Sequence, residues 1–302
     1  MNSYHTSVLL YESVDLLQIK PDGIYIDCTM GAGGHTQAIL NKLTSKGHVY
    51  AFDQDLDAGA NAINSDNLTL IQSNFRYIKQ FLKLYGVTHV DGIIADLGVS
   101  SHQFDLPERG FSYRFDAPLD MRMNTRSHFK ASDIIQTYSE DKLIYIFSTY
   151  GEVRNSKTLA KTIIQVRSRM SIHSTKLLNE VIEPLIIGPR QKYLAQVYQA
   201  LRIEVNQELE SLQQLLMDGY EVIRPGGRMA IITFHSLEDR MVKNAFKYGN
   251  IEGKMQQDMY GNIFRPWKII NKNVITPSQD EQKSNPRSSS AKLRVAEKIS
   301  QS

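Results

Sequence analysis

A short apolar run that ends in a glycine-rich turn constrains this sequence more than any other feature. Ile24 and Ile26 have the pattern of a strand, Asp27 closes it, and Gly31-Ala32-Gly33-Gly34 comes before a helical pattern. A strand, a tight turn and a helix in this order form a nucleotide-type pocket. Glycines permit positive φ and let a ligand approach the backbone, and the helix start offers free N–H groups. Many such turns merely connect a strand to a helix, so the turn alone does not decide function.

Further strand-like runs around this turn also end in polar residues. They are Val49–Phe52 before Asp53, Leu68–Ile71 before Asn74-Phe75, and Gly92–Ala95 before Asp96. Helical patterns separate them, which predicts an α/β fold with a parallel sheet. Their polar ends then share the edge of the sheet where ligands bind. Asp53 follows Gly33 by 20 positions, close to the spacing of a carboxylate that binds ribose hydroxyls.

The turn lacks one element of the dinucleotide-binding pattern. Thr36 stands where the third glycine belongs, and that glycine allows close helix packing beneath a pyrophosphate. With an acid just before the turn, this favours a cationic ligand without a diphosphate, for which S-adenosylmethionine is the natural candidate. We then expect Gly33, Gly34 and His35 to line its amino-acid tail, Asp53 to bind its ribose and Phe75 to pack on its adenine, although an aromatic at a helix start is more often a core residue.

Four other polar residues keep two interpretations each. Asp96 lies where a donated methyl group would meet its acceptor, but an acid at a strand end also caps loops. His102 and His235 are candidate acid or base groups, although lone histidines more often serve structure. Asn206, in an apolar helix, is either a packing amide or a substrate contact.

The pattern changes from strand–helix alternation to almost pure helix between residues 131 and 201. We therefore predict one domain from residues 1–105 and 201–302, interrupted by a helical domain at 106–200. Leu159, Ile163, Val166 and Met170 form its clearest apolar stripe. Two later runs, 228–234 and 291–296, resemble strands, and we expect residues 247–287 to be irregular.

Composition narrows the class of protein. A single cysteine, Cys28, fits a reducing compartment and excludes a multi-cysteine metal site, and no metal is indicated. No apolar run approaches the roughly 20 residues of a membrane span, and the start of the chain lacks signal-peptide features, so we expect a cytoplasmic protein without a membrane partner. Residues 151–202 hold nine Lys/Arg and three Glu, a net +6, within a chain of net +3. This local excess suggests nucleic acid, although a solvated helical face is the commoner explanation of a charge run.

Together the motifs resemble the bacterial 16S ribosomal RNA cytidine N4-methyltransferases (RsmH/MraW type) from near residue 4 to near residue 296. The matching blocks are 5–10 (HTSVLL), 31–35 (GAGGH), 96–103 (DLGVSSHQ), 108–112 (ERGFS), 118–123 (PLDMRM), 234–240 (FHSLEDR) and 285–294 (NPRSSSAKLR). Family members often carry proline where this chain has Ser7 and His102, both in predicted loops.

The resemblance implies a class I (Rossmann-like) methyltransferase sheet with an inserted, mostly helical substrate domain. It implies methyl transfer from S-adenosylmethionine to N4 of a cytidine near the decoding centre of 16S rRNA, with the naked rRNA or the small ribosomal subunit as partner. It assigns cofactor contacts to Gly33, Gly34, His35, Asp53, Phe75, Asp96 and Gln103. Our candidate catalytic residues are Asp96, Ser100 in the same loop, His102 and His235.

We expect exposed cations of the insert to bind RNA phosphates, namely Arg154, Lys157, Lys161, Arg167 and Arg169. A homodimer is left open. A nicotinamide-dependent dehydrogenase would require the missing third glycine. A non-catalytic RNA-binding protein with a relic pocket would have lost its acidic strand ends, yet Asp27, Asp53 and Asp96 are all present.

Overall fold

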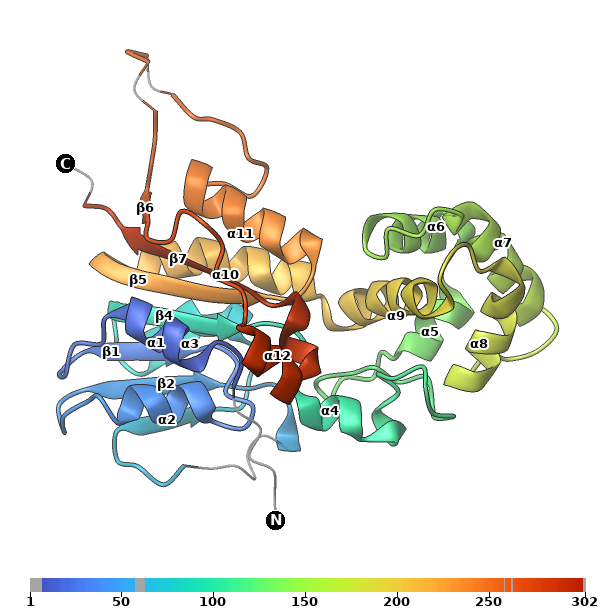
Figure 1. The fold of residues 1–302 in the computed structure, drawn as a ribbon, viewed down its shortest axis with the longest axis horizontal. Coiled ribbons are helices and arrows are strands. Elements are labelled where there is room, and N and C mark those ends of the chain that lie inside the picture. The colour runs from blue at the N-terminus through green and yellow to red at the C-terminus, as the bar shows by residue number, and fades with distance from the viewer. Residues whose placement is uncertain (1–6, 58–62, 258, 262, 301–302) are drawn as a thin grey trace. The chain divides into compact units, whose positions relative to one another are not determined.

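The computed structural model describes residues 7–57, 63–257, 259–261 and 263–300 (Figure 1). It divides into two compact units, one of residues 1–98 and 209–302 and one of residues 99–208. Each is described by itself below.

The first unit is built on a seven-stranded sheet in the order β3-β2-β1-β4-β5-β7-β6. Neighbours among β1 to β5 pair in parallel, and β7 runs antiparallel to both β5 and β6. This order, with its reversed strand, is that of a class I methyltransferase and confirms the predicted fold. The strands are β1 (Ile24–Asp27), β2 (His48–Phe52), β3 (Leu68–Ile71), β4 (Val90–Asp96), β5 (Ile223–Thr233), β6 (Trp267–Ile269) and β7 (Lys292–Lys298).

Helices cover both faces of the sheet. Because successive side chains of a strand point to opposite faces, each strand contributes to the core on both sides. Tyr25 and Ile94 pack in a cluster with α1 (Leu10–Leu17) and α2 (Gly34–Leu40). Their neighbours Ile26 and Ile93 belong to the opposite cluster. That cluster includes residues of α3 (Ile78–Leu84), α10 (Glu208–Val222) and α11 (Ser236–Tyr248). Parallel pairing of β1, β2 and β4 places the carboxyl ends of these strands at one edge of the covered sheet.

The stretch 247–287 is more ordered than expected. It contains β6 and α12 (Gln279–Ser284), and a 3₁₀ turn, Pro286–Ser290, follows before β7. The sequence gives little sign of β6 because this strand has three residues, of which only Trp267 is buried. β6 forms by pairing with β7, about 30 residues further along the chain.

The second unit is helical. It contains α4 (Ser101–Asp105), α5 (Ala131–Thr137), α6 (Glu140–Thr149), α7 (Ser156–Arg167), α8 (Thr175–Ile182), α9 (Arg190–Asn206) and 3₁₀ turns at Pro107–Arg109 and Glu183–Leu185. Leu159 and Ile163 of the predicted stripe are fully buried, whereas Met170 lies beyond the end of α7 and is 44% exposed. Within the described residues, no helix is both long and apolar enough to span a bilayer.

Candidate active site

Three acids come together at the carboxyl edge of the sheet. Asp27 ends β1, Asp96 ends β4, and Asp53 directly follows β2. The sheet order places β1 between β2 and β4, so the three carboxylates lie on adjacent strands. The alternation of strands and helices was enough to predict this grouping.

The glycine turn begins at this edge and is held in a conformation that favours glycine. Gly31 and Gly33 have φ of 51° and 83°, in the left-handed region where a side chain is strained. The Gly31 N–H donates to Asp53 Oδ2 at 2.8 Å. The Gly33 N–H donates to the Met30 carbonyl at 2.7 Å, and Gly33 is the N-cap of α2. The turn is therefore fastened to the strand end that carries Asp53.

Thr36 explains the missing third glycine. Its hydroxyl donates to Asp27 Oδ2 at 2.6 Å, and the Thr29 N–H donates to Oδ1 of the same carboxylate. Asp27 and Thr36 have no exposed surface. Burial raises the pKa of Asp27, and the hydrogen bonds from the two threonines oppose that shift. Asp27 thus supports the turn from beneath.

Asp53 accepts two backbone hydrogen bonds, from Gly31 and, at 2.8 Å, from Asp55. Each carboxylate oxygen has a second lone pair, so Asp53 can also accept ribose hydroxyls. Burial raises the pKa of Asp53 to about 6, against the effect of the two hydrogen bonds. A ligand that donates hydrogen bonds to this carboxylate is therefore favoured.

Asp96 has unused hydrogen-bonding capacity. Its N–H donates to Thr29 Oγ1 at 2.7 Å, but its buried Oδ1 has no hydrogen-bond partner within the described residues. Burial raises the pKa of Asp96 well above its usual range, and the nearby carboxylates of Asp27, Glu238 and Glu281 raise it further. A buried acceptor among other acids fits a cationic ligand or an N–H donor.

His35 and Phe75 adjoin the same edge. The His35 side chain is 3% exposed, and its ring hydrogen-bonds the Val8 backbone while Nε2 has no hydrogen-bond partner among the described residues. Burial lowers the pKa of His35 to about 4, so the ring is neutral at pH 7. Phe75 opens a 3₁₀ turn after β3 and packs, half-buried, against the core. His5 and Thr6 of the opening motif lie outside the described residues.

Ser100, His102 and Gln103 belong to the second unit. Ser100 is the N-cap of α4, where its Oγ accepts from the Gln103 N–H at 3.2 Å and its own N–H donates to Gln103 Oε1 at 3.0 Å. Gln103 is 4% exposed, whereas His102 is exposed. This reciprocal cap explains why a serine and a glutamine stand three positions apart.

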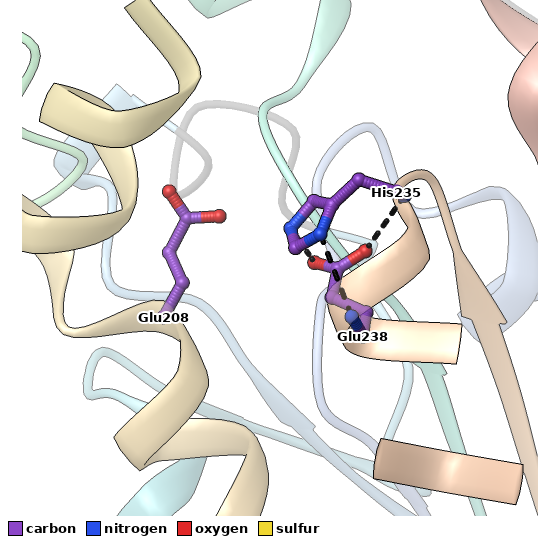
Figure 2. Close-up of side chains that lie close together, drawn as sticks. All are labelled: Glu208, His235 and Glu238. Carbon is purple, nitrogen blue, oxygen red and sulfur yellow. Dashed lines mark hydrogen bonds and ion pairs between the residues drawn. The ribbon is translucent and has the colours of Figure 1, made fainter. Parts of the chain in front are cut away.

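His235 is the N-cap of α11 (Figure 2). Its Nδ1 accepts from the Glu238 N–H at 3.4 Å, and Glu238 Oε2 accepts from the Phe234 and His235 N–H groups at 2.8 and 3.3 Å. Nε2 lies 3.2 Å from Glu238 Oε1, without hydrogen-bond geometry. His235 thus caps the helix through Nδ1, and Nε2 faces the Glu238 carboxylate. Glu208, also drawn there, is ion-paired with Arg202 at 2.8 Å.

The two interpretations of Asn206 are now distinguished. Its Oδ1 accepts from the Met123 N–H at 2.7 Å, and its Nδ2 donates to the Met121 and Arg202 carbonyls. Asn206 is therefore a packing amide that orders the irregular segment after Arg109. The buried guanidinium of Arg109 donates to the carbonyl of Met123 in the same segment.

The basic residues of the insert differ in exposure. Arg154, Lys157, Lys161 and Arg169 are exposed, whereas Arg167 is half-buried. The Arg167 guanidinium donates to the Ile135 carbonyl at 2.7 Å, in the last turn of α5, where a cation also complements the helix dipole. The first four side chains are accessible to solvent, whereas Arg167 makes a structural hydrogen bond.

Comparison with known proteins identifies the family. The sequence model of the MraW methylase family matches residues 2–299. The chain belongs to the MraW methylase family. This membership confirms the predicted resemblance, and it confirms that the chain is an S-adenosylmethionine-dependent methyltransferase.

Relatives of this MraW-family chain align along almost its whole length. A ribosomal RNA small subunit methyltransferase H from Phocaeicola vulgatus is 53% identical over 98% of this chain and 97% of its own. The protein of the same name from Bacteroides fragilis strain YCH46 is 52% identical over 98% of both chains. A solved rRNA methylase from Streptococcus thermophilus aligns with a TM-score of 0.40 and 14% identity, over 96% of each chain.

Two acids of the site escaped the sequence reasoning. Glu238 and Glu281 both raise the pKa of Asp96. The first had a local signal, because an N-cap residue followed three positions later by Glu is a helix-start pattern. The second had none, since its relation to the site depends on the tertiary fold.

Proposed function

We propose that this methyltransferase transfers a methyl group from S-adenosylmethionine to the exocyclic N4 amine of a cytidine in 16S rRNA near the decoding centre. The observation that carries the proposal is the buried, unpartnered Oδ1 of Asp96 at the end of β4, beside a glycine turn and Asp53. The names of relatives more than 50% identical over the full chain support the RNA substrate.

The acids at the edge of the sheet suit the positive charge of S-adenosylmethionine, whose sulfonium supplies an electrophilic methyl group. We assign the amino-acid tail to Gly33, Gly34 and His35, the ribose to Asp53 and the adenine to Phe75. The family resemblance adds Gln103 to these assignments. The neutral ring of His35 and the acids at the sheet edge suit a ligand with a sulfonium and an ammonium group.

Asp96 is the residue best suited to act on the acceptor. The lone pair of the cytosine amine is delocalised into the ring, so the amine is a weak nucleophile. A carboxylate that accepts one amine hydrogen favours a pyramidal nitrogen, and positioning lowers the barrier further. Asp96 Oδ1 offers such an acceptor, and a neighbouring carbonyl in the 96–101 loop is the alternative. Ser100, His102 and His235 remain proposed site residues, with capping as the observed role of Ser100 and His235.

The helical region at residues 106–200 is assigned to substrate recognition. Its exposed cations would contact phosphates, while the target cytidine is single-stranded or flipped from a helix so that N4 can reach the donor. We place the reaction in the cytoplasm, with 16S rRNA or the small subunit as partner. A homodimer stays a prediction that sedimentation of the purified protein tests.

The deciding experiment is methylation of defined RNA. Small ribosomal subunits and naked 16S rRNA are incubated with the protein and methyl-labelled S-adenosylmethionine, and the RNA is digested to nucleosides. We expect label in N4-methylcytidine from one site. Label in another nucleoside, or protein that binds the donor without labelling either RNA, would contradict the proposal.

A further inference from the structure

A hydrogen bond joins a residue near the start of the described chain to one on α12. Glu281 Oε1, on α12, accepts the Leu9 N–H at 2.8 Å across 272 positions of sequence. Leu9 is 1% exposed and is the N-cap of α1, in a left-handed conformation with φ of 49° and no side-chain cap. A buried N–H at a helix start requires an acceptor from elsewhere, and Glu281 supplies it.

The segment Ser7–Leu9, held by this bond, lies against the glycine turn. A Cβ on Gly34 would come within 2.1 Å of Ser7 Oγ, so Gly34 lacks a side chain where Ser7 packs. The backbone of the next residue, Val8, forms a hydrogen bond with the His35 ring. Two residues of the segment thus touch two residues that we assign to the donor's amino-acid tail.

Glu281 also acts on Asp96. Its carboxylate is close enough to raise the pKa of Asp96. One side chain from the end of the chain therefore influences both the glycine turn, through residues 7–9, and the acid that closes β4.

We propose that Glu281 is a positioning residue of the donor site, which holds Ser7–Leu9 against Gly34 and His35 through its bond to the Leu9 N–H. This rests on the proposed function, since the glycine turn is taken as the site of the donor. Glu281 touches neither the methyl group nor the RNA in this account. Its loss acts mainly on donor affinity, because the bond to Leu9 is lost completely while Glu281 makes the smallest of the carboxylate contributions that raise the pKa of Asp96.

The test compares Glu281→Ala with Glu281→Gln, whose amide oxygen can still accept from Leu9. The control is Asp280→Ala, because Asp280 is the neighbouring residue on α12 with a side chain 94% exposed. Calorimetry gives the Kd of S-adenosylmethionine and of S-adenosylhomocysteine, and turnover gives KM and kcat.

Glu281→Ala is expected to weaken both ligands about tenfold and to raise KM for the donor, with kcat within about twofold of wild type. Glu281→Gln should recover most of the affinity, and Asp280→Ala should match wild type. Wild-type affinity in a folded Glu281→Ala protein would overturn the proposal, as would an equal loss in Glu281→Gln. If Glu281→Ala does not fold, Glu281→Asp, one methylene shorter, must show the same selective rise in KM. A wild-type protein that binds no donor would instead refute the proposed function.

Discussion

The hydroxyl of Thr36 donates a hydrogen bond of 2.6 Å to the carboxylate of Asp27, with both side chains fully buried. This bond connects the first turn of α2 to the end of β1 and stands where a dinucleotide-binding protein has glycine. Threonine at this position therefore stabilises the fold, because its hydroxyl offsets part of the free-energy cost of burying the Asp27 carboxylate beneath the turn.

Thr36→Val is expected to lower the free energy of unfolding by about 1–3 kcal/mol, because the buried carboxylate loses a donor while the side-chain volume is kept. Thr36→Ser keeps the hydroxyl and loses one buried methyl group, which costs about 1 kcal/mol. Denaturant unfolding of the three proteins gives these values. A valine variant as stable as the wild type would show that the bond contributes nothing.

Asp53→Asn is expected to weaken S-adenosylmethionine binding about tenfold, because charged acceptors form hydrogen bonds stronger by roughly 1 kcal/mol than neutral ones. Calorimetry at pH 7.5 measures the change. Adenine-containing ligands without ribose hydroxyls supply the control, since their affinity should not depend on this substitution.

The same carboxylate predicts a pH dependence. The pKa of Asp53 in the folded protein is raised to about 6 from 3.8. Without a ligand, the Asp53 carboxyl therefore stays protonated up to about pH 6, and its ionisation above that pH destabilises the folded protein. Ribose hydroxyls that donate to the ionised form relieve this, and donor affinity should rise between pH 5 and pH 7. In Asp53→Asn the rise should shrink, and an unchanged rise would assign it to Asp96 or another group.

RNA binding is expected to depend steeply on salt. Each of Lys157→Ala and Lys161→Ala should reduce the slope of log affinity against log salt by about one, because each exposed lysine releases about one counterion from RNA. Filter binding of a 16S rRNA fragment over a range of salt concentrations measures the slope. Lys46→Ala, an exposed lysine of the first unit, is the matched control, and an equal change there would remove the case for a specific face.

Arg167 should behave differently from the other basic residues of the insert. Its bond to the Ile135 carbonyl predicts that Arg167→Ala lowers the free energy of unfolding by about 1.5–3 kcal/mol. Exposed Arg169 is the comparison, and Arg169→Ala should leave the unfolding free energy within about 0.5 kcal/mol of wild type. Thermal unfolding distinguishes the pair, and equal stability of the two variants would contradict a structural role for Arg167.

The sheet and its acidic edge could be predicted because their signals are local. Asp27 and Asp96 each follow an apolar run of adjacent residues, and β4 is buried without a break from Val90 to Ala95, as a strand covered on both faces should be. β6 could not be predicted from the sequence, because a three-residue strand is defined by its partner β7 rather than by its own pattern. Sequence reasoning placed 247–287 as irregular for that reason.

Side-chain roles were harder to predict than side-chain positions. Gln103 and Ser100 both lie in a recognisable motif, but only the structure shows that they cap one another. Glu281 contacts a residue 272 positions away, and no local pattern in one sequence carries such a contact. Contacts of this kind follow from how the two ends of the chain pack on one sheet.

Asp96→Asn separates binding from chemistry. Asparagine keeps the size of the side chain but is a weaker acceptor than a carboxylate, so the amine hydrogen is held less strongly as the methyl group approaches. We expect kcat to fall about 10²-fold, the scale of losing one well-placed group in a transition state. Donor affinity is measured in parallel by calorimetry, and kcat is measured at saturating donor.

Because Asp96 is buried among acids that raise its pKa, the neutral asparagine should not unfold the protein, and the melting temperature of the variant should equal or exceed that of wild type. Turnover near normal at saturating donor would remove Asp96 from the chemical step and leave a neighbouring carbonyl in the 96–101 loop as the acceptor.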